Sequence, residues 1–259
     1  MTSVTFKSRP ARTVFVSDVH LGTRLSNAAA FLAFLETVEP EYLYLVGDIL
    51  DGWSLTKKFY WPPENTRIVD RVLDLRRRGT MVRITPGNHD DFLRRPLPMI
   101  DQFEMAEEFV HETICGRRLW VTHGDLFDAM EVGGRRLSMF GARIFDQFTR
   151  VLPRKGLLWI RRSSKRIFSK PDRLHQRITD NALSRDVQGL IYGHTHHPRL
   201  AIESGIVCGN CGDWIQHQSA IVELPDGRMQ LLNAGEVIGE LPANLATLEL
   251  VQATGDAIQ

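Results

Sequence analysis

The chain is organised around residues 81–90, which read MVRITPGNHD. The first five of these residues are mostly apolar or β-branched, which is typical of a buried strand. The segment that follows, Gly87-Asn88-His89-Asp90, has the composition of a turn, because Gly and Asn tolerate φ > 0 and Asp caps a following helix. Turns of this composition are common, so the segment alone does not indicate a functional site.

Four other short apolar runs end in Asp or His in the same way. They end at Ser17-Asp18-Val19-His20, Gly47-Asp48, Thr122-His123-Gly124-Asp125 and Gly193-His194-Thr195-His196. In open α/β sheets the ligand crevice lies outside the carboxyl ends of the strands. We therefore expect the five polar clusters to form one shared site.

The order of strands and helices along the chain predicts an α/β fold. Strands are expected at residues 13–17, 42–46, 81–85, 109–113, 118–122, 188–192, 199–203, 206–209, 219–224 and 229–232, and amphipathic helices at 27–38 and 68–78. The second half is rich in strands separated by Gly or Pro-Asp-Gly turns, which predicts antiparallel pairing there. This pattern predicts one sandwiched α/β domain over residues 13–232, and residues 233–259 are expected to be a C-terminal tail.

The composition excludes two classes of protein. Three cysteines in 259 residues do not build a disulfide framework, and the single pair Cys208 and Cys211 cannot complete a four-ligand zinc site, so we expect core or loop thiols. The first apolar stretch, Val14 to Val16, is too short for a signal peptide, and no run approaches the roughly 18 apolar residues that span a bilayer. We expect a cytoplasmic protein, with a peripheral position on the inner face of the membrane as a further expectation.

Positive charge is concentrated between the fourth and fifth clusters. Residues 131–177 contain 13 Lys or Arg and 3 acidic residues, although the whole chain carries only +1. Apolar residues recur every three or four positions within this segment, which predicts two basic amphipathic helices inserted as a lid. Such helices suit an anionic membrane surface, and we favour this partner over nucleic acid, which needs only cationic charge. The simpler alternative is that the helices only pack on their own domain.

The side chains of the five clusters indicate a metal site. Asp18, His20, Asp48, Asn88, His123, His194 and His196 offer carboxylate, amide and imidazole donors without a thiolate, a set suited to manganese, iron or zinc. Taken singly, each Asp is more often a cap and each His a core or surface residue, but the ordered set favours metal binding. Seven donors exceed the need of one catalytic ion, so we expect two divalent ions, manganese first, bridged by Asp48 as in phosphatases and nucleases.

The five motifs resemble the five blocks of the calcineurin-like metallophosphoesterases, over roughly residues 13 to 224. The resemblance implies a four-layered α/β/β/α sandwich. It also implies that Asp18, His20, Asp48 and His196 hold one ion, and that Asp48, Asn88, His123 and His194 hold the other. His89 would then be the catalytic residue that contacts the substrate phosphate and protonates the leaving group, with Asp90 as a candidate to orient its ring.

Three stretches resemble one group within that family more closely. Ser17 to Gly22, Gly47 to Trp53 and Gly212-Asp213-Trp214 are similar to the UDP-2,3-diacylglucosamine pyrophosphatases of lipid A synthesis. The resemblance implies a lipid-linked nucleotide substrate, although the group has arginine where this chain has His89, which indicates a divergent branch. The alternatives are a nucleotide or nucleic-acid phosphodiesterase without a lipid role and, third, a non-catalytic scaffold.

Further substrate contacts are less clearly indicated. Arg94 and Arg95 are candidate phosphate ligands because they follow the third cluster directly. The aromatic residues Trp53, Phe59, Tyr60 and Trp61 either line a substrate pocket or belong to the core.

Overall fold

The computed structural model describes residues 10–95, 103–129 and 171–244. The chain forms two compact units, of which the first combines Met1–His123 with Asp186–Gln259 and the second is Gly124–Arg185. The insertion predicted at 131–177 falls within the second unit, and its residues up to 170 lie outside the described part of the chain.

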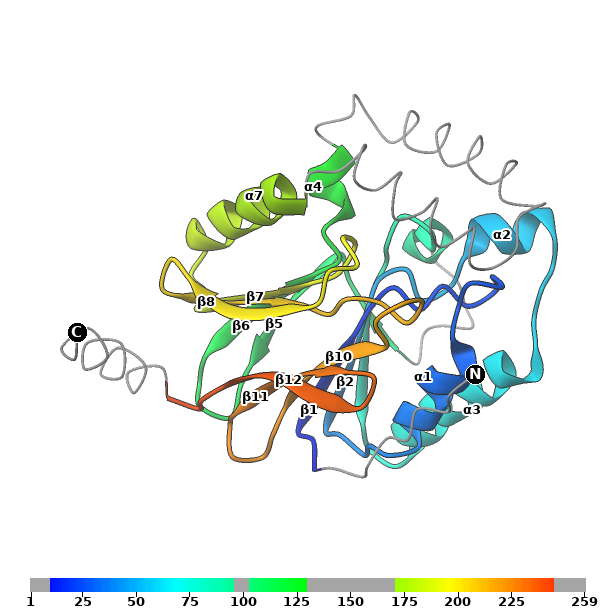
Figure 1. Ribbon diagram of the computed structural model, residues 1–259, viewed down its shortest axis with the longest axis horizontal. Coiled ribbons are helices and arrows are strands. Elements are labelled where there is room, and N and C mark those ends of the chain that lie inside the picture. Colours follow the sequence, from blue (N-terminus) through cyan, green and yellow to red (C-terminus); the bar gives the residue numbers. More distant parts are fainter. Residues whose placement is uncertain (1–9, 96–102, 130–170, 245–259) are drawn as a thin grey trace. The chain divides into compact units, whose positions relative to one another are not determined.

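A seven-stranded sheet forms one layer of the first unit (Figure 1). Its order is β12-β11-β10-β1-β2-β3-β4. The strands are β1 (Thr13–Val16), β2 (Tyr42–Val46), β3 (Met81–Thr85), β4 (Glu104–Met105), β10 (Ser219–Glu223), β11 (Met229–Asn233) and β12 (Glu236–Leu241). Strands β1 to β4 pair in parallel, whereas β10, β11 and β12 extend the sheet in antiparallel fashion from β1.

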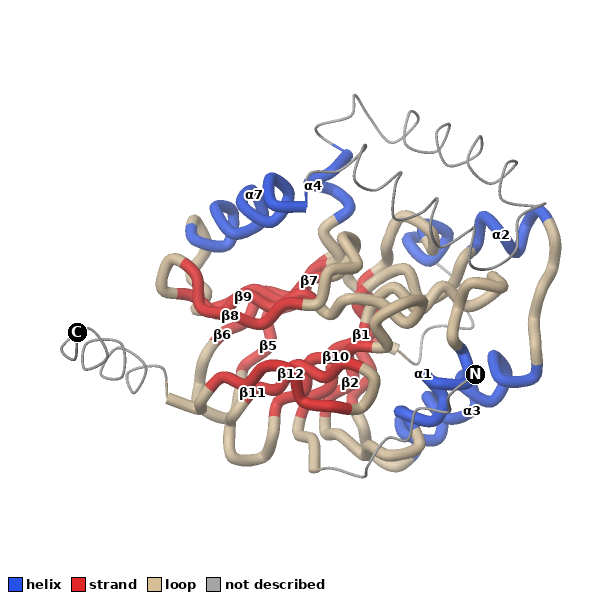
Figure 2. Tube along the Cα trace, in the orientation of Figure 1, coloured by secondary structure: helices blue, strands red, loops and turns tan. Residues whose placement is uncertain are grey.

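A five-stranded sheet of order β5-β6-β7-β9-β8 forms the second β layer of this unit (Figure 2). Its strands are β5 (Glu108–Glu112), β6 (Arg118–Thr122), β7 (Gly189–Tyr192), β8 (Arg199–Glu203) and β9 (Ile206–Asn210). The expected hairpin between β5 and β6 is confirmed, and its turn contains Gly116 at φ 77°, a backbone conformation that glycine adopts without strain. The expected antiparallel pairs β8–β9 and β10–β11 are confirmed as well.

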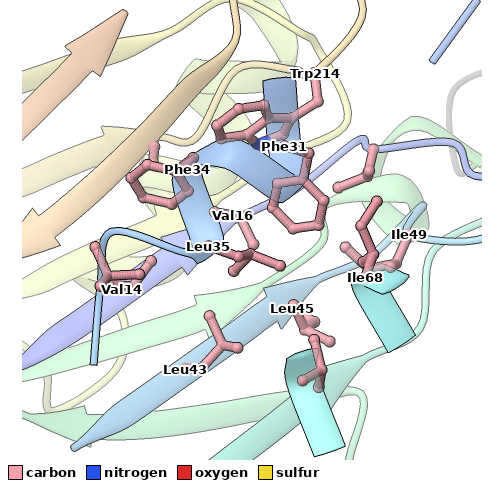
Figure 3. Close-up of a cluster of buried hydrophobic side chains, with 14 of the residues drawn as sticks. Val14, Val16, Phe31, Phe34, Leu35, Leu43, Leu45, Ile49, Ile68 and Trp214 are labelled. Carbon is pink, nitrogen blue, oxygen red and sulfur yellow. The ribbon is translucent and has the colours of Figure 1, made fainter. Parts of the chain in front are cut away.

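Two helices cover the outer face of the first sheet, as the apolar periodicity predicts. Helix α1 (Ala28–Leu35) buries Phe31 and Leu35, and α3 (Pro63–Arg77) buries Ile68, Val72 and Leu75 at spacings of four and three residues. These side chains pack on Val14, Val16, Leu43 and Leu45 of β1 and β2 in one core cluster (Figure 3). Each buried side chain of this size stabilises the fold by about 1.5–3 kcal/mol.

A second core lies between the two sheets. It joins Phe15 and Tyr44 of the first sheet to Val121 and Ile191 of the second. The rings of Phe15 and Tyr44 stack with centroids 4.9 Å apart. The strands of both sheets are thus held in one unit, so that the loops at the carboxyl ends of β1, β2, β3, β6 and β7 come together.

The α/β fold class is confirmed, and the first unit contains one helical and two β layers. The prediction that residues from 233 onward form only a tail is wrong, because Glu236–Leu241 forms strand β12 at the edge of the first sheet. This strand escapes pattern analysis because its apolar residues Val237 and Ile238 are both exposed, so it joins the sheet through backbone pairing. In the second unit, helix α7 (Pro171–Leu183) continues past the expected end of the insertion at 177 and contacts α4 (Asp125–Ala129).

The part of the chain that the structure describes contains no helix long and apolar enough to cross a bilayer. Cys115, Cys208 and Cys211 form no disulfide, and the latter two are buried, as expected for core thiols.

Candidate metal centre

The polar loops after β1 and β2 lie side by side. The backbone N–H of Asp18 donates to Gly47 O at 3.0 Å, and that of His20 donates to Asp48 O at 2.9 Å. Such bonds continue the parallel pairing of the strands past their ends. They place the first two polar clusters against each other.

Five of the predicted ligands adopt a left-handed backbone conformation. Their φ values are 52° for Asp18, 53° for His20, 54° for Asp48, 65° for His194 and 60° for His196. This region costs energy for residues with a side chain, and such strain concentrates at functional sites. The loops therefore point these side chains inward at the expense of stability, a feature that the sequence did not reveal.

Asp18, His20 and His196 form one group of potential ligands. Nε2 of His196 lies 2.8 Å from Asp18 Oδ1, and Nε2 of His20 lies 3.7 Å from the same oxygen. Burial acts to raise the pKa of Asp18, but the charge and hydrogen bonding of His196 outweigh it and hold that pKa well below its usual range. Asp18 is therefore a carboxylate, ready to bind a cation.

Asp48, His123 and His194 form a second such group. Nδ1 of His123 hydrogen-bonds Val46 O at 3.0 Å, which makes Nδ1 the protonated nitrogen and turns Nε2 toward Asp48 Oδ1 at 3.6 Å. The backbone N–H of His194 donates to Asp18 Oδ2 at 2.9 Å, so the two groups also share a direct hydrogen bond.

Asp48 belongs to the second group and also faces the first. Its Oδ2 is 3.7 Å from His20 Nε2, and its Oδ1 is 3.6 Å from His123 Nε2. Burial acts to raise the pKa of Asp48, but the neighbouring His89 and His123 lower it far below the ordinary value. One carboxylate oxygen therefore faces each group, which is the arrangement expected of a bridging ligand.

Asn88 lies on the loop after β3, and Asp90 organises that loop. Asp90 accepts hydrogen bonds from Gly87 N at 2.5 Å and from Ile49 N at 2.8 Å. Burial and the charge of Asp48 raise the pKa of Asp90 to about 6. Among the described residues, Asn88 Oδ1 is buried and accepts no hydrogen bond. A buried amide oxygen without a donor is costly, and a bound cation would satisfy it.

The glycines beside these ligands leave no room for a side chain. A Cβ at Gly47 would lie 2.3 Å from the His123 ring, and one at Gly87 would lie 2.3 Å from Asp48 Oδ1. The loops therefore pack directly on the ligands and fix their positions.

His89 is oriented by Asp51 and not by Asp90. Nδ1 of His89 lies 3.0 Å from Asp51 Oδ2, and the Trp53 ring lies over His89 with centroids 4.2 Å apart. Both partners follow the second cluster in sequence, and Asp51 also caps α2 (Gly52–Lys57) by accepting from Ser54 N at 2.8 Å. The expectation for Asp90 is wrong because its two oxygens already bind backbone N–H groups.

Arg94 holds the Asn88 loop in place. Its guanidinium donates to Gly87 O at 2.7 Å, to Pro86 O at 3.1 Å and to Glu107 at 2.8 Å. These bonds engage the guanidinium N–H groups that would otherwise bind a phosphate. The geometry therefore favours a role for Arg94 in positioning the Asn88 loop. Arg95 comes directly after the short 3₁₀ helix Asp91–Arg94 and is exposed.

The site has a buried floor and a more exposed rim. Asp18, His20, Asp48 and His123 are at most 2% exposed, whereas Asn88, His89, His194 and His196 are partly exposed. A substrate would therefore meet His89 and the rim histidines first. The structure brings six of the seven predicted ligands and His89 together, and Asn88 lies beside His89 on the loop that binds Asp48. It adds Asp51, Trp53 and Asp213.

A family model for calcineurin-like phosphoesterases matches residues 11–198. The chain belongs to the calcineurin-like phosphoesterase family. Among curated relatives, a UDP-2,3-diacylglucosamine hydrolase of Vibrio atlanticus is 24% identical over 240 residues, covering 83% of this chain and 94% of the relative. The protein of that name from Coxiella burnetii is 24% identical over 241 residues, covering 85% of this chain and 96% of the relative.

Among solved structures, the phosphoesterase Yfce from E. coli superposes on this phosphoesterase with a TM-score of 0.51. It is 18% identical, and the match covers 90% of this chain and 99% of that one, which supports the fold assignment.

As a calcineurin-like phosphoesterase, the protein is a hydrolase of phosphoester or pyrophosphate bonds that uses divalent metal ions. The residues present fit this chemistry. Carboxylate and imidazole donors converge around Asp48. Asn88 precedes His89, whose N–H donates to Asp48, and the buried Asn88 Oδ1 lacks a hydrogen-bond donor in the described part of the chain.

Proposed function

We propose that this phosphoesterase hydrolyses the pyrophosphate bond of a lipid-linked nucleotide of the UDP-2,3-diacylglucosamine type, using two divalent ions. The observation that carries the two-ion part is the position of Asp48, with one oxygen toward each of two ligand groups. The substrate class is supported by curated relatives of that name that match this chain over nearly their full length.

Each ion would have four ligands from this chain. Asp18, His20, Asp48 and His196 would hold one, and Asp48, Asn88, His123 and His194 would hold the other. When bound, the pair supplies the positive charge that activates water and stabilises the charge developing on the phosphoryl oxygens. Manganese is our first choice, with iron and zinc compatible with the same donors.

His89 would contact the substrate phosphate and assist the departing oxygen. Because Asp51 accepts a hydrogen bond from Nδ1, the other ring nitrogen, Nε2, is the atom available for substrate. Contact with the tilted ring of Trp53 limits rotation of the His89 ring. The ring is therefore held in one orientation before substrate arrives, which reduces the cost of reaching the transition state.

An anionic membrane surface is the proposed site of action. In the described part of the chain, Lys57 at the end of α2 is exposed, as are Lys58 and Phe59 directly after it, Phe59 at 76%. The Phe59 ring stacks on Trp61 at 6.4 Å, and Arg24 lies over Tyr60 at 5.6 Å. An exposed aromatic ring beside cationic side chains suits the interface of an anionic bilayer. From its sequence alone, the basic segment 131–177 is proposed to bind an anionic membrane surface as well.

A phosphodiesterase acting on nucleotides or nucleic acid is the second candidate. The Asp51–His89 pair favours it, because an oriented imidazole can protonate an alkoxide leaving group. A phosphate leaving group, as in pyrophosphate hydrolysis, does not require this protonation.

Hydrolysis assays on purified protein with Mn²⁺ separate the two candidates. UDP-2,3-diacylglucosamine and bis-p-nitrophenyl phosphate are tested in parallel, with Asp48→Ala as the metal-site control. Release of UMP that is abolished in the variant supports the lipid-linked substrate. Cleavage of the artificial diester alone contradicts it and leaves the second candidate.

A further inference from the structure

We infer that Asp213 is the positioning residue that presents His196 to a metal ion, an inference that rests on the dinuclear site proposed above. Asp213 lies just after β9 in the Gly212-Asp213-Trp214 motif, to which the reaction itself gives no role. It is 1% exposed, so its carboxylate must find its partners inside the protein.

The two ring nitrogens of His196 face different carboxylates. Nδ1 lies 2.9 Å from Asp213 Oδ2, and Nε2 lies 2.8 Å from Asp18 Oδ1. A carboxylate only accepts hydrogen bonds, so Asp213 holds the ring proton on Nδ1. Nε2 faces the Asp18 carboxylate, which also only accepts, so a cation bound by both atoms would take the place of the proton between them.

The other oxygen of Asp213 is fixed by the backbone. Oδ1 accepts from the N–H groups of Ile215, Gln216 and His217 at 3.1, 2.7 and 3.0 Å. Three donors on Oδ1 fix the rotation of the carboxylate. Oδ2 is thereby held toward His196.

The same segment also positions Asp18. The backbone N–H of Trp214 donates to Asp18 O at 3.1 Å, and Ser17 Oγ donates to Gly212 O at 3.2 Å. The Trp214 ring is fully buried against Phe31 and Phe34 of α1, with centroids 4.8 and 5.2 Å away. The helical core thus anchors one short segment that sets two ligands of the same ion.

Asp213→Asn is a selective test of this role. The three backbone N–H donors keep the amide oxygen at the Oδ1 position, so the turn is retained. The amide –NH₂ then faces Nδ1 of His196 and donates to it. This donation removes the proton from Nδ1 and leaves one on Nε2, the nitrogen that must bind the ion.

Manganese titration of the full chain by calorimetry gives the first readout. We expect two ions in the wild type. We expect Asp213→Asn to bind one of them about 10–100-fold more weakly, because outer partners of ligating histidines typically contribute that much, and to bind the other as before. His217→Gln is the matched control, since its ring lies 3.5 Å from Asp213 Oδ1 and makes no contact with His196 that the structure gives. It should bind both ions like the wild type.

The ring proton of His196 gives a second readout that needs no metal. Long-range ¹H–¹⁵N spectra of the metal-free protein should show protons on both ring nitrogens in the wild type, because each faces a carboxylate, and a proton on Nε2 alone in Asp213→Asn. If Asp213→Asn leaves both the affinity for the two ions and the protonation of the His196 ring unchanged, the role of Asp213 is overturned and the dinuclear site is not. A wild-type chain that binds fewer than two ions overturns the dinuclear site, and the role of Asp213 with it.

Discussion

His89 Nδ1 lies 3.0 Å from Asp51 Oδ2, although 38 residues separate the two in sequence. The loops after β2 and β3 bring them together, since the N–H of Gly52 donates to His89 O at 3.0 Å and the N–H of His89 donates to Asp48 Oδ1 at 2.7 Å. The loop after β2 thus provides both Asp48, the central ligand, and Asp51, the partner of the proposed acid His89.

Asp51→Asn should lower kcat by about 100-fold or more, because oriented acid–base groups contribute about 10²–10⁴. The loss should be larger for methyl phenyl phosphate than for methyl p-nitrophenyl phosphate, since phenolate is the poorer leaving group. Asp91→Asn, on the neighbouring 3₁₀ helix, is the control and should retain full activity. Equal losses on both esters would indicate that Asp51 only supports the loop.

Gly87→Ala should abolish the metal site. The added methyl group would lie 2.3 Å from Asp48 Oδ1 and 2.8 Å from His123 Nε2, so these two ligands or the loop itself must move. Manganese content after dialysis, measured by atomic emission, should fall below that of the wild type. Gly239→Ala is the matched control, because its nearest neighbour would be Leu231 Cβ at 3.6 Å, an ordinary contact. Retention of two ions by Gly87→Ala would contradict the tight packing described for this loop.

Arg94→Ala and Arg95→Ala should behave differently. Removing Arg94 leaves the carbonyl groups of Pro86 and Gly87 without their donor, which should lower the free energy of unfolding by about 1–3 kcal/mol. Removing the exposed Arg95 should leave unfolding unchanged and raise KM, if it contacts substrate as the sequence predicts. Urea denaturation and steady-state kinetics measure both. An unchanged KM for Arg95→Ala would remove it from the substrate contacts.

Stability at low pH should depend on Glu223. This buried carboxylate accepts from Thr13 Oγ1 at 2.6 Å and lies 3.0 Å from His111 Nε2. Burial acts to raise its pKa, but the hydrogen bonds of His111 and Thr13 lower it from 4.5 to about 2. A lowered folded-state pKa gives stability that is present above pH 4.5 and is lost as the pH falls toward 2.

The free energy of unfolding of the wild type should therefore fall more steeply below about pH 4.5 than that of Glu223→Gln, which cannot ionise. Urea denaturation at several pH values between 2 and 7 measures the two slopes. Parallel slopes would show that other carboxylates dominate the acid transition.

Phe59→Ser should weaken binding to vesicles of phosphatidylglycerol and phosphatidylethanolamine, because it removes the most exposed aromatic side chain of the loop. Val69→Ser on α3 is the control, since Val69 is 40% exposed and lies outside the aromatic loop. Cosedimentation gives the bound fraction, and hydrolysis of bis-p-nitrophenyl phosphate should be the same in both variants. Equal vesicle binding by both variants would exclude this loop from the membrane contact.

Much of the site could be predicted because its ligands follow short apolar strands directly. The run Tyr42–Val46 predicts β2, and the carboxyl end of that strand places Asp48 at the crevice. Partners of the ligands were harder to find. Asp51 and Asp213 are single carboxylates in loops, and only the folded structure shows which histidine each of them faces.

Strand β12 and the role of Arg94 were missed for similar reasons. Val237 and Ile238 are exposed, so β12 lacks the alternation that marks a strand with one buried face. The carbonyl groups that Arg94 binds belong to the backbone, which carries no sequence signal.

Crystals grown with Mn²⁺ and measured at the manganese absorption edge would test the dinuclear site most directly. Two anomalous peaks about 3.5–4 Å apart are predicted on either side of Asp48. One peak should lie against Asp18, His20 and His196, and the other against Asn88, His123 and His194. A single peak, or two peaks that do not share Asp48, would contradict the bridging role of that carboxylate and the hydrolytic mechanism built on it.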